Sequence, residues 1–282
     1  MHNICLIHKI VNKFVSYSTT DMGKLLVHLH LYYHDQTDYF MDKLSNITVP
    51  FKLIVTMTDE NGEIRNRILS EYPDAQVIIV ENAGYDVYPF FQAMKQVDLS
   101  QYEYILKLHT KNQRKKLHVN HLHFRGYGFR DNLILPLVGS KKNFDIALDS
   151  ITSSDKVGIV CPRFFLLKKE APANRPMTER LCNEYGIPFS SDVPFCSGTM
   201  FLCRREIIQF LLKNNYTADD YGRQLKTGNV GSLAHSMETM FGIACDHLGY
   251  HVKGIDGSSL YYTLVLYYKT IFHKDVRWLL AQ

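Results

Sequence analysis

Residues 77–111 read VIIVENAGYDVYPFFQAMKQVDLSQYEYILKLHTK. The stretch begins with a short apolar run at 77–80, continues into an aromatic-rich helical segment at 87–97, and ends in a second apolar run at 104–108. Two apolar runs joined by a helix of about ten residues are typical of parallel strands in one sheet, because parallel strands need a crossover connection. This stretch therefore predicts an α/β fold.

The same alternation continues on both sides of this stretch. Residues 25–33 place apolar side chains at the period of a strand, and residues 36–44 place them at helical spacing. We therefore expect a single Rossmann-type domain, in which helices flank a mostly parallel central sheet. The further expected elements are strands at 51–57, 157–161 and 199–203, helices at 63–71, 131–138, 144–152, 204–212 and 232–248, and a loop around one helix at 172–194.

The composition is that of a folded protein with almost balanced charge. Of the 282 residues, 46% are hydrophobic and 21% are charged, which argues against long disordered regions. Lys and Arg number 32 and Asp and Glu number 28, so the net charge is only +4. That excess is too small to predict a nucleic-acid partner, whereas an anionic ligand or an anionic membrane surface would suit it.

The cysteines and the first residues favour a cytoplasmic protein. The six cysteines form no C-x-x-C pair and most have apolar neighbours, so we expect reduced, buried thiols. Residues 1–14 contain His8, Lys9 and Lys13 and no small-residue cleavage site, so they do not resemble a secretory signal. No run reaches the ~18 apolar residues that a membrane span needs.

The C-terminal residues 256–282 differ in composition from residues 1–255. From Leu260 onward, aromatic side chains mix with lysine and arginine, a composition found in interfacial segments. We expect a domain over 1–255 and a helical tail over 256–282 that contacts the inner face of the cytoplasmic membrane or a partner protein. A helix that packs on the domain itself, or on a second subunit, would have the same composition.

Three turns should line one crevice, because ligands of open α/β sheets bind beyond the carboxyl ends of the strands. The turn after the strand at 51–57 carries polar groups able to hydrogen-bond a base or a ribose. The second turn contains a glycine, which allows close backbone approach, and an aspartate at a helix N-cap position. The third turn follows the strand at 104–108 and opens a basic loop. The candidate ligand-binding residues are Thr56, Thr58 and Asp59 in the first turn, Asn82, Gly84 and Asp86 in the second, and His109, Thr110 and Lys111 in the third.

Several of these residues also have a structural interpretation. Asp86 would serve as a helix cap alone, and His109 would be a hydrogen-bonded histidine near the end of its strand. Lys111 begins a run of positive charge with Arg114, Lys115 and Lys116, which would either attract phosphate or simply be solvated. The spacing of the residues leaves both interpretations open.

Four fragments of the chain occur in a characteristic order. Residues 82–90 read Asn-x-Gly-x-Asp-x-x-Pro-Phe and lead through a helix to a strand that ends in His-Thr-Lys. Arg130 precedes a helix that ends in Leu-Val-Gly, and the segments 195–204 and 231–242 read FCSGTMFLCR and GSLAHSMETMFG. In these fragments the chain resembles the rhamnan synthesis protein F family, bacterial glycosyltransferases of cell-wall, capsular and O-antigen polysaccharides.

The resemblance implies a fold similar to the GT-A class and a nucleoside-diphosphate sugar as the donor, of the dTDP-rhamnose or UDP-galactose type. It implies that a rhamnose- or galactose-type sugar is transferred, with inversion, to a glycan or a lipid-linked glycan in the synthesis of a capsule, a lipopolysaccharide O-antigen or a rhamnan. An alternative of another class is a non-catalytic nucleotide-sugar or glycan-binding module that supports a separate polymerase.

Metal dependence is the feature in which this chain departs from the GT-A pattern. Such enzymes commonly hold a divalent metal on an Asp-x-Asp motif, and here the corresponding place reads His109-Thr110-Lys111. A lysine at this position is already a cation that can offset the charge of a diphosphate. We therefore expect catalysis that does not depend strictly on Mn²⁺ or Mg²⁺, although the imidazole of His109 would still be able to assist such a metal.

The resemblance also implies roles for residues of the second half. Glu238, near the start of a late helix, would act as the base, and His235 at i−3 on the same helical face would orient the acceptor. The alternative for Glu238 is a surface or ion-paired glutamate on an amphipathic helix. Arg130 would hold the donor phosphates. The acceptor floor would be formed by Ser197, Gly198 and Thr199, whose structural interpretation is a turn at the entry of a strand.

Overall fold

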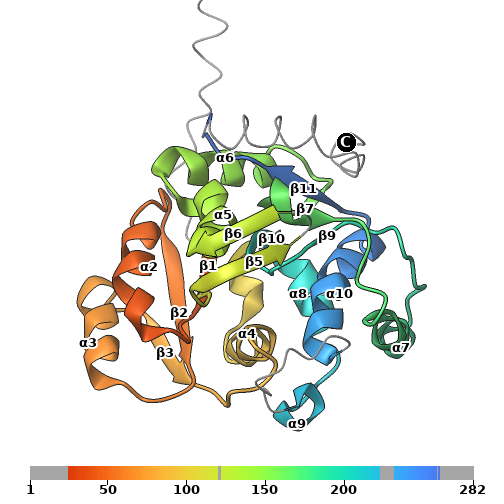
Figure 1. The fold of residues 1–282 in the computed structure, drawn as a ribbon, viewed down its shortest axis with the longest axis horizontal. Coiled ribbons are helices and arrows are strands. Elements are labelled where there is room, and N and C mark those ends of the chain that lie inside the picture. The colour runs from red at the N-terminus through yellow and green to blue at the C-terminus, as the bar shows by residue number, and fades with distance from the viewer. Residues whose placement is uncertain (1–24, 120–121, 223–231, 259, 261–282) are drawn as a thin grey trace, which may run out of the picture.

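A seven-stranded sheet lies at the centre of the described chain, in the order β11-β7-β10-β4-β1-β2-β3 (Figure 1). The computed structural model describes residues 25–119, 122–222, 232–258 and 260. Within the sheet, β10 runs antiparallel to both of its neighbours and every other neighbouring pair is parallel. The predicted α/β fold with a mostly parallel sheet is therefore confirmed. The strands are β1 (Leu25–His30), β2 (Phe51–Met57), β3 (Gln76–Ile79), β4 (Tyr104–His109), β7 (Val157–Pro162), β10 (Phe201–Arg204) and β11 (His251–Ile255).

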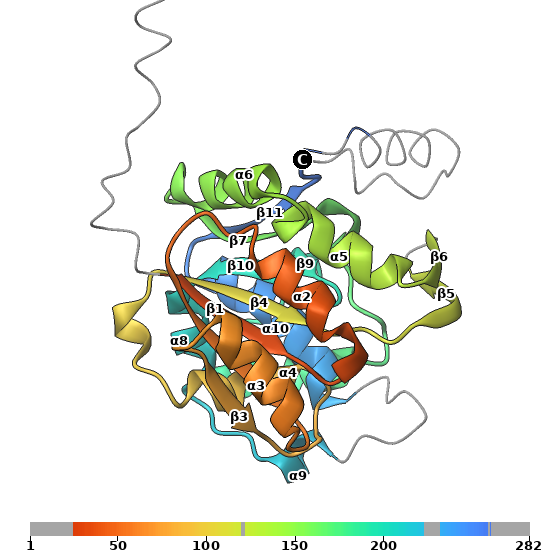
Figure 2. The same cartoon turned by 90° about the vertical axis from the view of Figure 1, so that its left-hand side faces the viewer.

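Helices cover both faces of the sheet (Figure 2). Their apolar side chains form two buried clusters, one on each side of the strands. The first cluster receives α4 (Val87–Met94), α7 (Arg175–Tyr185), α8 (Arg205–Leu211) and α10 (Leu233–His247), and the second receives α2 (Thr37–Leu44), α3 (Gly62–Glu71), α5 (Gly128–Val138) and α6 (Lys141–Thr152).

On the face covered by α4 and α10, the central strands change from apolar to polar toward their carboxyl ends. Leu26, Ile54 and Ile105 belong to the apolar cluster of this face. Because side chains two residues apart on a strand point to the same face, the following positions face the same helices. These positions hold buried polar side chains, namely His28 and His30 on β1, Thr56 on β2, and Lys107 and His109 on β4.

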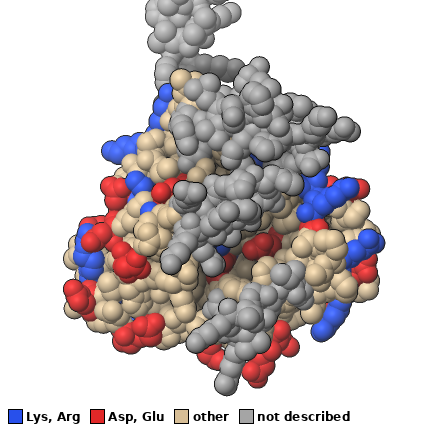
Figure 3. All heavy atoms as spheres, in the orientation of Figure 1, with Lys and Arg blue, Asp and Glu red and all other residues tan. Residues whose placement is uncertain are grey.

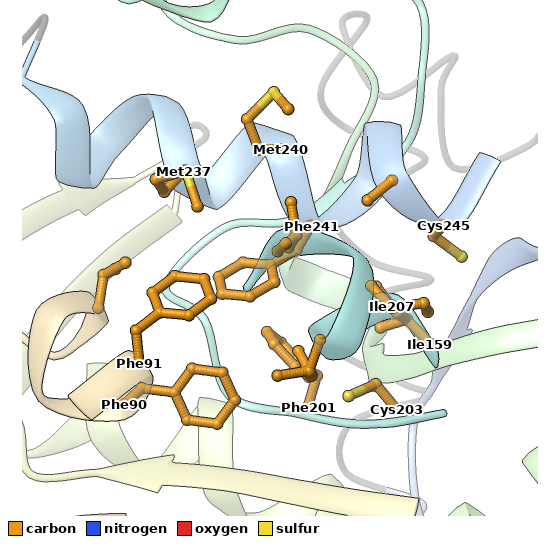
Figure 4. Packing of buried hydrophobic residues seen from close by; sticks show 14 of the residues in the cluster. Phe90, Phe91, Ile159, Phe201, Cys203, Ile207, Met237, Met240, Phe241 and Cys245 are labelled. Atoms are coloured by element: carbon orange, nitrogen blue, oxygen red, sulfur yellow. The ribbon is translucent and has the colours of Figure 1, made fainter. Parts of the chain in front are cut away.

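Aromatic packing fixes α10 against α4 and β10 (Figure 4). The ring of Phe241 on α10 stacks on Phe91 of α4, with centroids 5.8 Å apart and planes 8° apart. Its centroid also lies 5.0 Å from that of Phe201 on β10. Burying three aromatic side chains together is worth several kcal/mol of stability. This contact fixes the beginning of α10, and therefore Glu238, relative to the ends of the strands.

The structure differs from the sequence prediction mainly in short strands. The expected basic loop is wrong, because β5 (Arg114–Val119) and β6 (Leu122–Gly126) form a hairpin there. The edge strand β11 and the small pair β8 (Leu166–Leu167) and β9 (Phe195–Cys196) were not expected either. The strands β8 and β9 have two residues each, which is too short for a periodic signal. The hairpin strands do alternate apolar and polar residues at 117–119 and 122–125, a signal that the sequence prediction did not use.

Other predictions are met in part by the described residues. The cysteines from Cys161 onward are buried and free, as expected. Among the residues that the structure describes, no helix is long and apolar enough to cross a membrane. Almost all of the tail at 256–282 lies outside the described residues, so its separation from 1–255 and its contacts stay predictions.

Candidate active site

Asp86 belongs to the turn that connects β3 to α4. In space, this turn lies beside the carboxyl end of β4. Asp86 is the N-cap residue of α4, yet its side chain makes no capping hydrogen bond. Gly84 and Tyr85 both have φ near +56°, and a Cβ at Gly84 would collide with the ring of Tyr221 and the Cβ of Tyr88. Only glycine suits that position. The turn therefore directs the Asp86 carboxylate away from the helix and into the sheet, which contradicts a role as a helix cap alone.

The Asp86 carboxylate binds cations and a hydroxyl. Its Oδ2 lies 2.5 Å from Lys107 Nζ and accepts a hydrogen bond from the Thr199 hydroxyl. Its Oδ1 lies 3.3 Å from His109 Nε2 and 3.9 Å from Lys111 Nζ. Burial raises the pKa of Asp86, but His109, Lys107 and Lys111 outweigh it and hold that pKa well below its usual range. Asp86 is therefore ionised at neutral pH.

Neutral histidines extend this cluster into the sheet. The Thr56 hydroxyl lies 3.0 Å from both His28 Nε2 and His30 Nδ1. Burial lowers the pKa of His30 to about 4 and the pKa values of His28 and His109 well below their usual value. The positive charge around Asp86 at neutral pH is therefore supplied by the two lysines. We call this buried group the floor of the site, consisting of His28, His30, Thr56, Asp86, Lys107, His109 and Thr199.

Two adjoining cavities lie next to the floor. Figure 3 shows a hollow near the middle of this face of the molecule, with acidic atoms visible inside it. The two cavities have volumes of about 200 and 160 Å³. Both are lined by Tyr85, Asp86, Lys111 and Asn112. The larger cavity is completed by Val87, Phe129, Ala234, His235 and Glu238, and the smaller by His30, Tyr32, Tyr33, His109 and Thr110.

Glu238 reaches the larger cavity from the first turns of α10. Burial is the main reason that its pKa rises to about 7. Lys111 and Lys107 oppose that rise, and Asp86 adds to it. Glu238 is thus a half-buried group that titrates near neutral pH, in contrast to a glutamate paired on the surface.

His235 and Lys111 complete the lining near Glu238. His235 Nδ1 lies 2.8 Å from the Ser232 hydroxyl, and its ring centroid lies 5.3 Å from that of Tyr85. The Lys111 ammonium lies 5.3 Å from the centroid of the Phe129 ring and keeps 19% of its side chain exposed. We call Tyr85, Lys111, His235 and Glu238 the wall of the site.

Thr110 and the Lys111 backbone hold the neighbouring turns. The Thr110 hydroxyl accepts hydrogen bonds from the backbone N–H groups of Tyr32 and Tyr33, at 3.0 and 3.1 Å. The Lys111 carbonyl accepts one from Gln36 Nε2 at 2.8 Å. The carboxyl ends of β1 and β4 are therefore joined, as the crevice prediction requires.

Several predicted ligand-binding residues line neither cavity. Thr58 and Asp59, after β2, contact each other at 3.1 Å, and Asp59 is exposed. Asn82 is exposed as well. Thr56 belongs to the floor, where its hydroxyl is occupied by the two histidines. The two cavities are thus lined by the turns after β1, β3 and β4, and the turn after β2 does not line them.

Arg130 occupies a structural position. Its guanidinium lies between the rings of Tyr39 and Tyr127, 3.5 and 4.1 Å from their centroids, and forms an ion pair with Asp131 at 2.9 Å. It also donates to Gln36 Oε1 at 3.4 Å. Arg130 therefore acts on the Lys111 turn through Gln36, and it lines neither cavity.

Of the predicted acceptor residues, Thr199 belongs to the floor, and Ser197 and Gly198 belong to the turn that precedes it. Thr199 is buried and bound to Asp86 and Lys107, and Gly198 precedes it with φ +84°. The Ser197 N–H donates to the Phe165 carbonyl at 2.7 Å. Thr199, predicted for the acceptor, is thus bonded to Asp86, predicted for the donor, and Asp86 shares a cavity with the predicted catalytic residues His235 and Glu238.

The site does not fit a divalent metal. Asp86 is the carboxylate nearest the turn at 109–111, and Lys107, Lys111 and Thr199 already occupy its oxygens. Within the described part of the chain, no group of three or more His, Cys, Asp or Glu side chains could hold a metal ion. A lysine ammonium at 2.5 Å would repel a divalent cation placed on the same carboxylate. The carboxylate of Asp86 is therefore not available as a metal ligand.

Lys107, His28, His30 and Tyr85 are site residues that the sequence analysis missed. A signal existed for the first three, because each interrupts an apolar strand at the positions that face α4 and α10. Tyr85 gives no such signal, since its position depends on the left-handed backbone of the turn.

Comparisons with known proteins add a family and several distant likenesses. The family described as rhamnan synthesis protein F matches residues 2–249. The uncharacterized protein WxcX of Xanthomonas campestris pv. campestris (strain B100) is 28% identical over 242 residues, which are 81% of this chain and 32% of that protein. WxcX of a second strain is 27% identical over the same shares. The chain therefore spans about a third of the length of these relatives.

Three solved structures with similar folds have TM-scores below 0.5. S. aureus TarS 1–349 has a TM-score of 0.43 and 14% identity, over 83% of this chain and 58% of that one. The same protein in complex with UDP gives 0.42 and 13%, over 78% and 55%. A 4-diphosphocytidyl-2C-methyl-D-erythritol synthase gives 0.40 and 9%, over 84% and 90%. At these scores the likenesses carry no weight for the chemistry of the site.

Proposed function

Because the chain belongs to the rhamnan synthesis protein F family, we propose that it is a glycosyltransferase that moves a sugar from a nucleoside diphosphate to a growing cell-surface polysaccharide. The observation that carries the proposal is the pairing of Lys111 and Glu238 across one cavity of about 200 Å³. A cation suits the diphosphate of a donor, and a carboxylate that titrates near pH 7 suits the activation of a hydroxyl.

The reaction needs a site for the leaving group. The bond between the anomeric carbon and the donor's phosphate oxygen breaks, and the nucleoside diphosphate departs with that electron pair. Lys111 lies between the two cavities, where its ammonium would stabilise the charge that develops on the diphosphate. Asp86 keeps Lys111 in place from below, at 3.9 Å.

The reaction also needs a base at the acceptor. The acceptor oxygen would bond to the anomeric carbon from the face opposite the diphosphate, which inverts the configuration, while its proton passes to Glu238. A pKa of about 7 gives Glu238 both the basicity and the ionised fraction that general-base catalysis uses. His235, in the same cavity, would orient the acceptor hydroxyl.

The nucleoside belongs in the smaller cavity on this proposal. Tyr32 and Tyr33 line it with edge-to-face rings 4.8 Å apart, and aromatic rings suit a planar base. Thr58 and Asp59 would contact the outer part of the nucleoside. The donor would be of the dTDP-rhamnose or UDP-galactose type, and the acceptor a glycan or lipid-linked glycan at the inner face of the membrane.

The first test is ligand binding followed by turnover. Thermal unfolding should be measured with dTDP, UDP, GDP and CDP and their sugar conjugates, each with Mn²⁺ and with chelator. A nucleotide at 100 times its Kd adds about 2.7 kcal/mol to the folded state. Release of nucleotide from the donor that binds should then be measured with glycan acceptors present.

Glu238→Gln should lower that release about 100- to 10,000-fold and leave donor affinity unchanged. The matched control is Glu179→Gln on α7, where the glutamate pairs with Arg175 on the surface. A chain that binds nucleotide but releases none above the rate of the Glu238 variant would instead be the non-catalytic binding module. Turnover that disappears in chelator and returns with Mn²⁺ would contradict the metal-independent part of the proposal.

A further inference from the structure

Gln36 is a buried amide beside the backbone of Lys111. It is the last residue of η1 (His34–Gln36), and only 2% of the residue is exposed. An amide has both donor and acceptor groups, and each of them costs free energy when it is buried without a partner. Gln36 Nε2 donates to the Lys111 carbonyl at 2.8 Å, and Gln36 Oε1 accepts from Arg130 Nη1 at 3.4 Å. Gln36 therefore connects Lys111 to Arg130.

The two partners of Gln36 require an amide. A carbonyl oxygen only accepts hydrogen bonds and a guanidinium only donates them, so Nε2 must face Lys111 and Oε1 must face Arg130. A glutamate at this position would keep the bond to Arg130 and lose the donor to Lys111. A methionine of similar length would lose both bonds. The connection therefore depends on this residue type and not only on its size.

The Arg130 end of the connection is held by three side chains. The rings of Tyr39 and Tyr127 enclose the guanidinium, and Asp131 pairs with it at 2.9 Å. The Tyr39 hydroxyl donates to Asp131 Oδ1 at 2.8 Å, which ties the ring and the carboxylate together. A guanidinium that is stacked and ion-paired has little freedom left. Arg130 therefore gives Gln36 a firm partner.

The Lys111 end of the connection is the cation proposed to bind the diphosphate. Lys111 lines both cavities, and its ammonium lies 3.9 Å from Asp86 Oδ1 and 5.3 Å from the centroid of the Phe129 ring. The preceding residue, Thr110, is bonded to the end of β1 through its N–H and its hydroxyl. The bond from Gln36 extends this attachment by one residue beyond Thr110. It therefore fixes the backbone from which the Lys111 side chain departs.

We propose that Gln36 is a positioning residue: its amide joins the Lys111 carbonyl to Arg130 and so directs the Lys111 ammonium to the place where a diphosphate binds. This inference deepens the proposed function and rests on it for the diphosphate. Arg130 then acts on the phosphates through Gln36 and Lys111, in place of the direct contact that the sequence predicted. The ligand chemistry is two linked phosphates, as in a nucleoside diphosphate or inorganic pyrophosphate.

The first measurement follows the Lys111 side chain by NMR without any ligand. The full chain is labelled with ¹³C in lysine, and Lys111→Arg identifies the signal of the Lys111 ε-methylene group. Because the ammonium lies over the Phe129 ring, this signal carries a ring-current shift, which Phe129→Leu removes. Gln36→Met should move the signal most of the way to its place in the Phe129→Leu variant. An unchanged signal in the folded Gln36→Met variant would overturn the proposal.

Gln36→Glu keeps the test decisive if the methionine variant fails to fold. This change keeps the acceptor for Arg130 and removes only the donor to Lys111, so the Lys111 signal should move in the same direction. The matched control is Gln209→Met at an exposed position of α8, which should leave the signal in place. Equal Lys111 signals in the parent chain and the Gln36→Glu variant would contradict the proposal by themselves.

The second measurement uses inorganic pyrophosphate as the probe and calorimetry as the readout. Gln36→Met should raise the Kd for pyrophosphate about 5- to 10-fold, because the loss of one hydrogen bond has roughly that effect. In the Lys111→Met background, Gln36→Met should have no further effect, since the ammonium that it positions is absent. A loss of affinity that is equal in both backgrounds would show a merely structural role and would overturn the proposal.

The two measurements separate this inference from the proposed function. A Lys111 signal that moves in a chain that binds neither pyrophosphate nor nucleotide would support the positioning by Gln36 and contradict the proposed function. A signal that stays in place in a chain with transferase activity would overturn the positioning and support the proposed function.

Discussion

The floor and the wall of the site are adjacent, since Asp86 of the floor lies 3.9 Å from Lys111 of the wall. The floor stabilises the charged form of its carboxylate, whereas the wall disfavours the charged form of its carboxylate. On the floor, the carboxylate of Asp86 is surrounded by the Lys107 ammonium and the Thr199 hydroxyl, with no exposure at Lys107. On the wall, Glu238 lies in a setting that disfavours its charge, and Lys111 is still partly exposed to the cavity. The difference indicates that the floor stabilises the fold and the wall is prepared for a ligand.

The comparison makes opposite predictions for the two regions. Removing a floor residue should cost folding free energy, because it leaves a buried partner without compensation. Removing a wall residue should cost binding or turnover and leave folding unchanged or improved, as is common where an active site is built from poorly solvated charges.

The largest effect is expected for Lys107→Met. This change leaves Asp86 ionised and buried without its closest cation, so the free energy of unfolding should fall by about 3–5 kcal/mol. Urea-induced unfolding measures it, with Lys213→Met on the surface as the control. Adding Asp86→Asn should recover part of the loss. A loss below about 1 kcal/mol would contradict a stabilising role for Lys107 and would group it with the wall residues.

The second largest effect is an increase in stability, which we expect for Glu238→Gln at pH 8. The folded-state pKa of Glu238, about 7, lies above the usual value of 4.5, so the folded protein binds that proton more tightly than the unfolded chain does. Glu238 therefore costs stability as the pH rises from about 4.5 through 7. The glutamine variant should be more stable by about 2–3 kcal/mol at pH 8 and nearly equal to the parent at pH 4.

Unfolding curves at the two pH values measure this difference. A glutamine variant that is less stable than the parent at pH 8 would show that Glu238 belongs to the structural network.

Lys111→Met should weaken nucleotide binding without a comparable loss of stability. A charge-assisted contact to a diphosphate is worth about 1.5–3 kcal/mol, so the Kd for the nucleoside diphosphate should rise roughly 10- to 100-fold. Calorimetry with the nucleotide that the thermal screen identifies measures it, and Lys213→Met again serves as the control. An unchanged Kd would remove Lys111 from the diphosphate site.

The smallest effect is expected for Thr56→Val. The Thr56 hydroxyl serves two buried imidazoles, so its loss should lower the free energy of unfolding by about 1–2 kcal/mol. Nucleotide affinity should stay unchanged, because Thr56 does not line either cavity. A weaker nucleotide complex at unchanged stability would instead show that Thr56 contacts the nucleoside, as the sequence pattern predicted.

Much of the first half of the fold could be predicted from the sequence, because its strands and helices carry strong local periodicity. The strand predicted at 51–57 is β2 (Phe51–Met57), and the strand predicted at 104–108 is one residue shorter than β4. The turns after these strands were recognisable from polar residues at strand ends. The rule that ligands bind at the carboxyl ends of parallel strands then brought His109 and Lys111 into the right crevice.

The rest depends on contacts between distant parts of the chain. Nothing local distinguishes Asp86 as a cap from Asp86 as the partner of Lys107, since Thr199 lies 113 residues away. Arg130 has the charge that phosphate attracts, but the rings of Tyr39 and Tyr127 enclose it. The local sequence identifies which residues are charged, but it does not identify their partners. The partners are determined by which distant segments the fold brings together.

The reversed strand β10 has a consequence for the order of events during synthesis. Asp86 leaves the ribosome 113 residues before Thr199, and Lys107 leaves it 92 residues before Thr199, the residue with which both form hydrogen bonds. A nascent chain that has reached only the parallel strands β1 to β4 therefore carries this ion pair with one side open to water. The first half of the sheet cannot finish folding until β10 inserts beside β4 and brings Thr199 to Asp86 and Lys107. Folding of the first half therefore depends on synthesis of the second half.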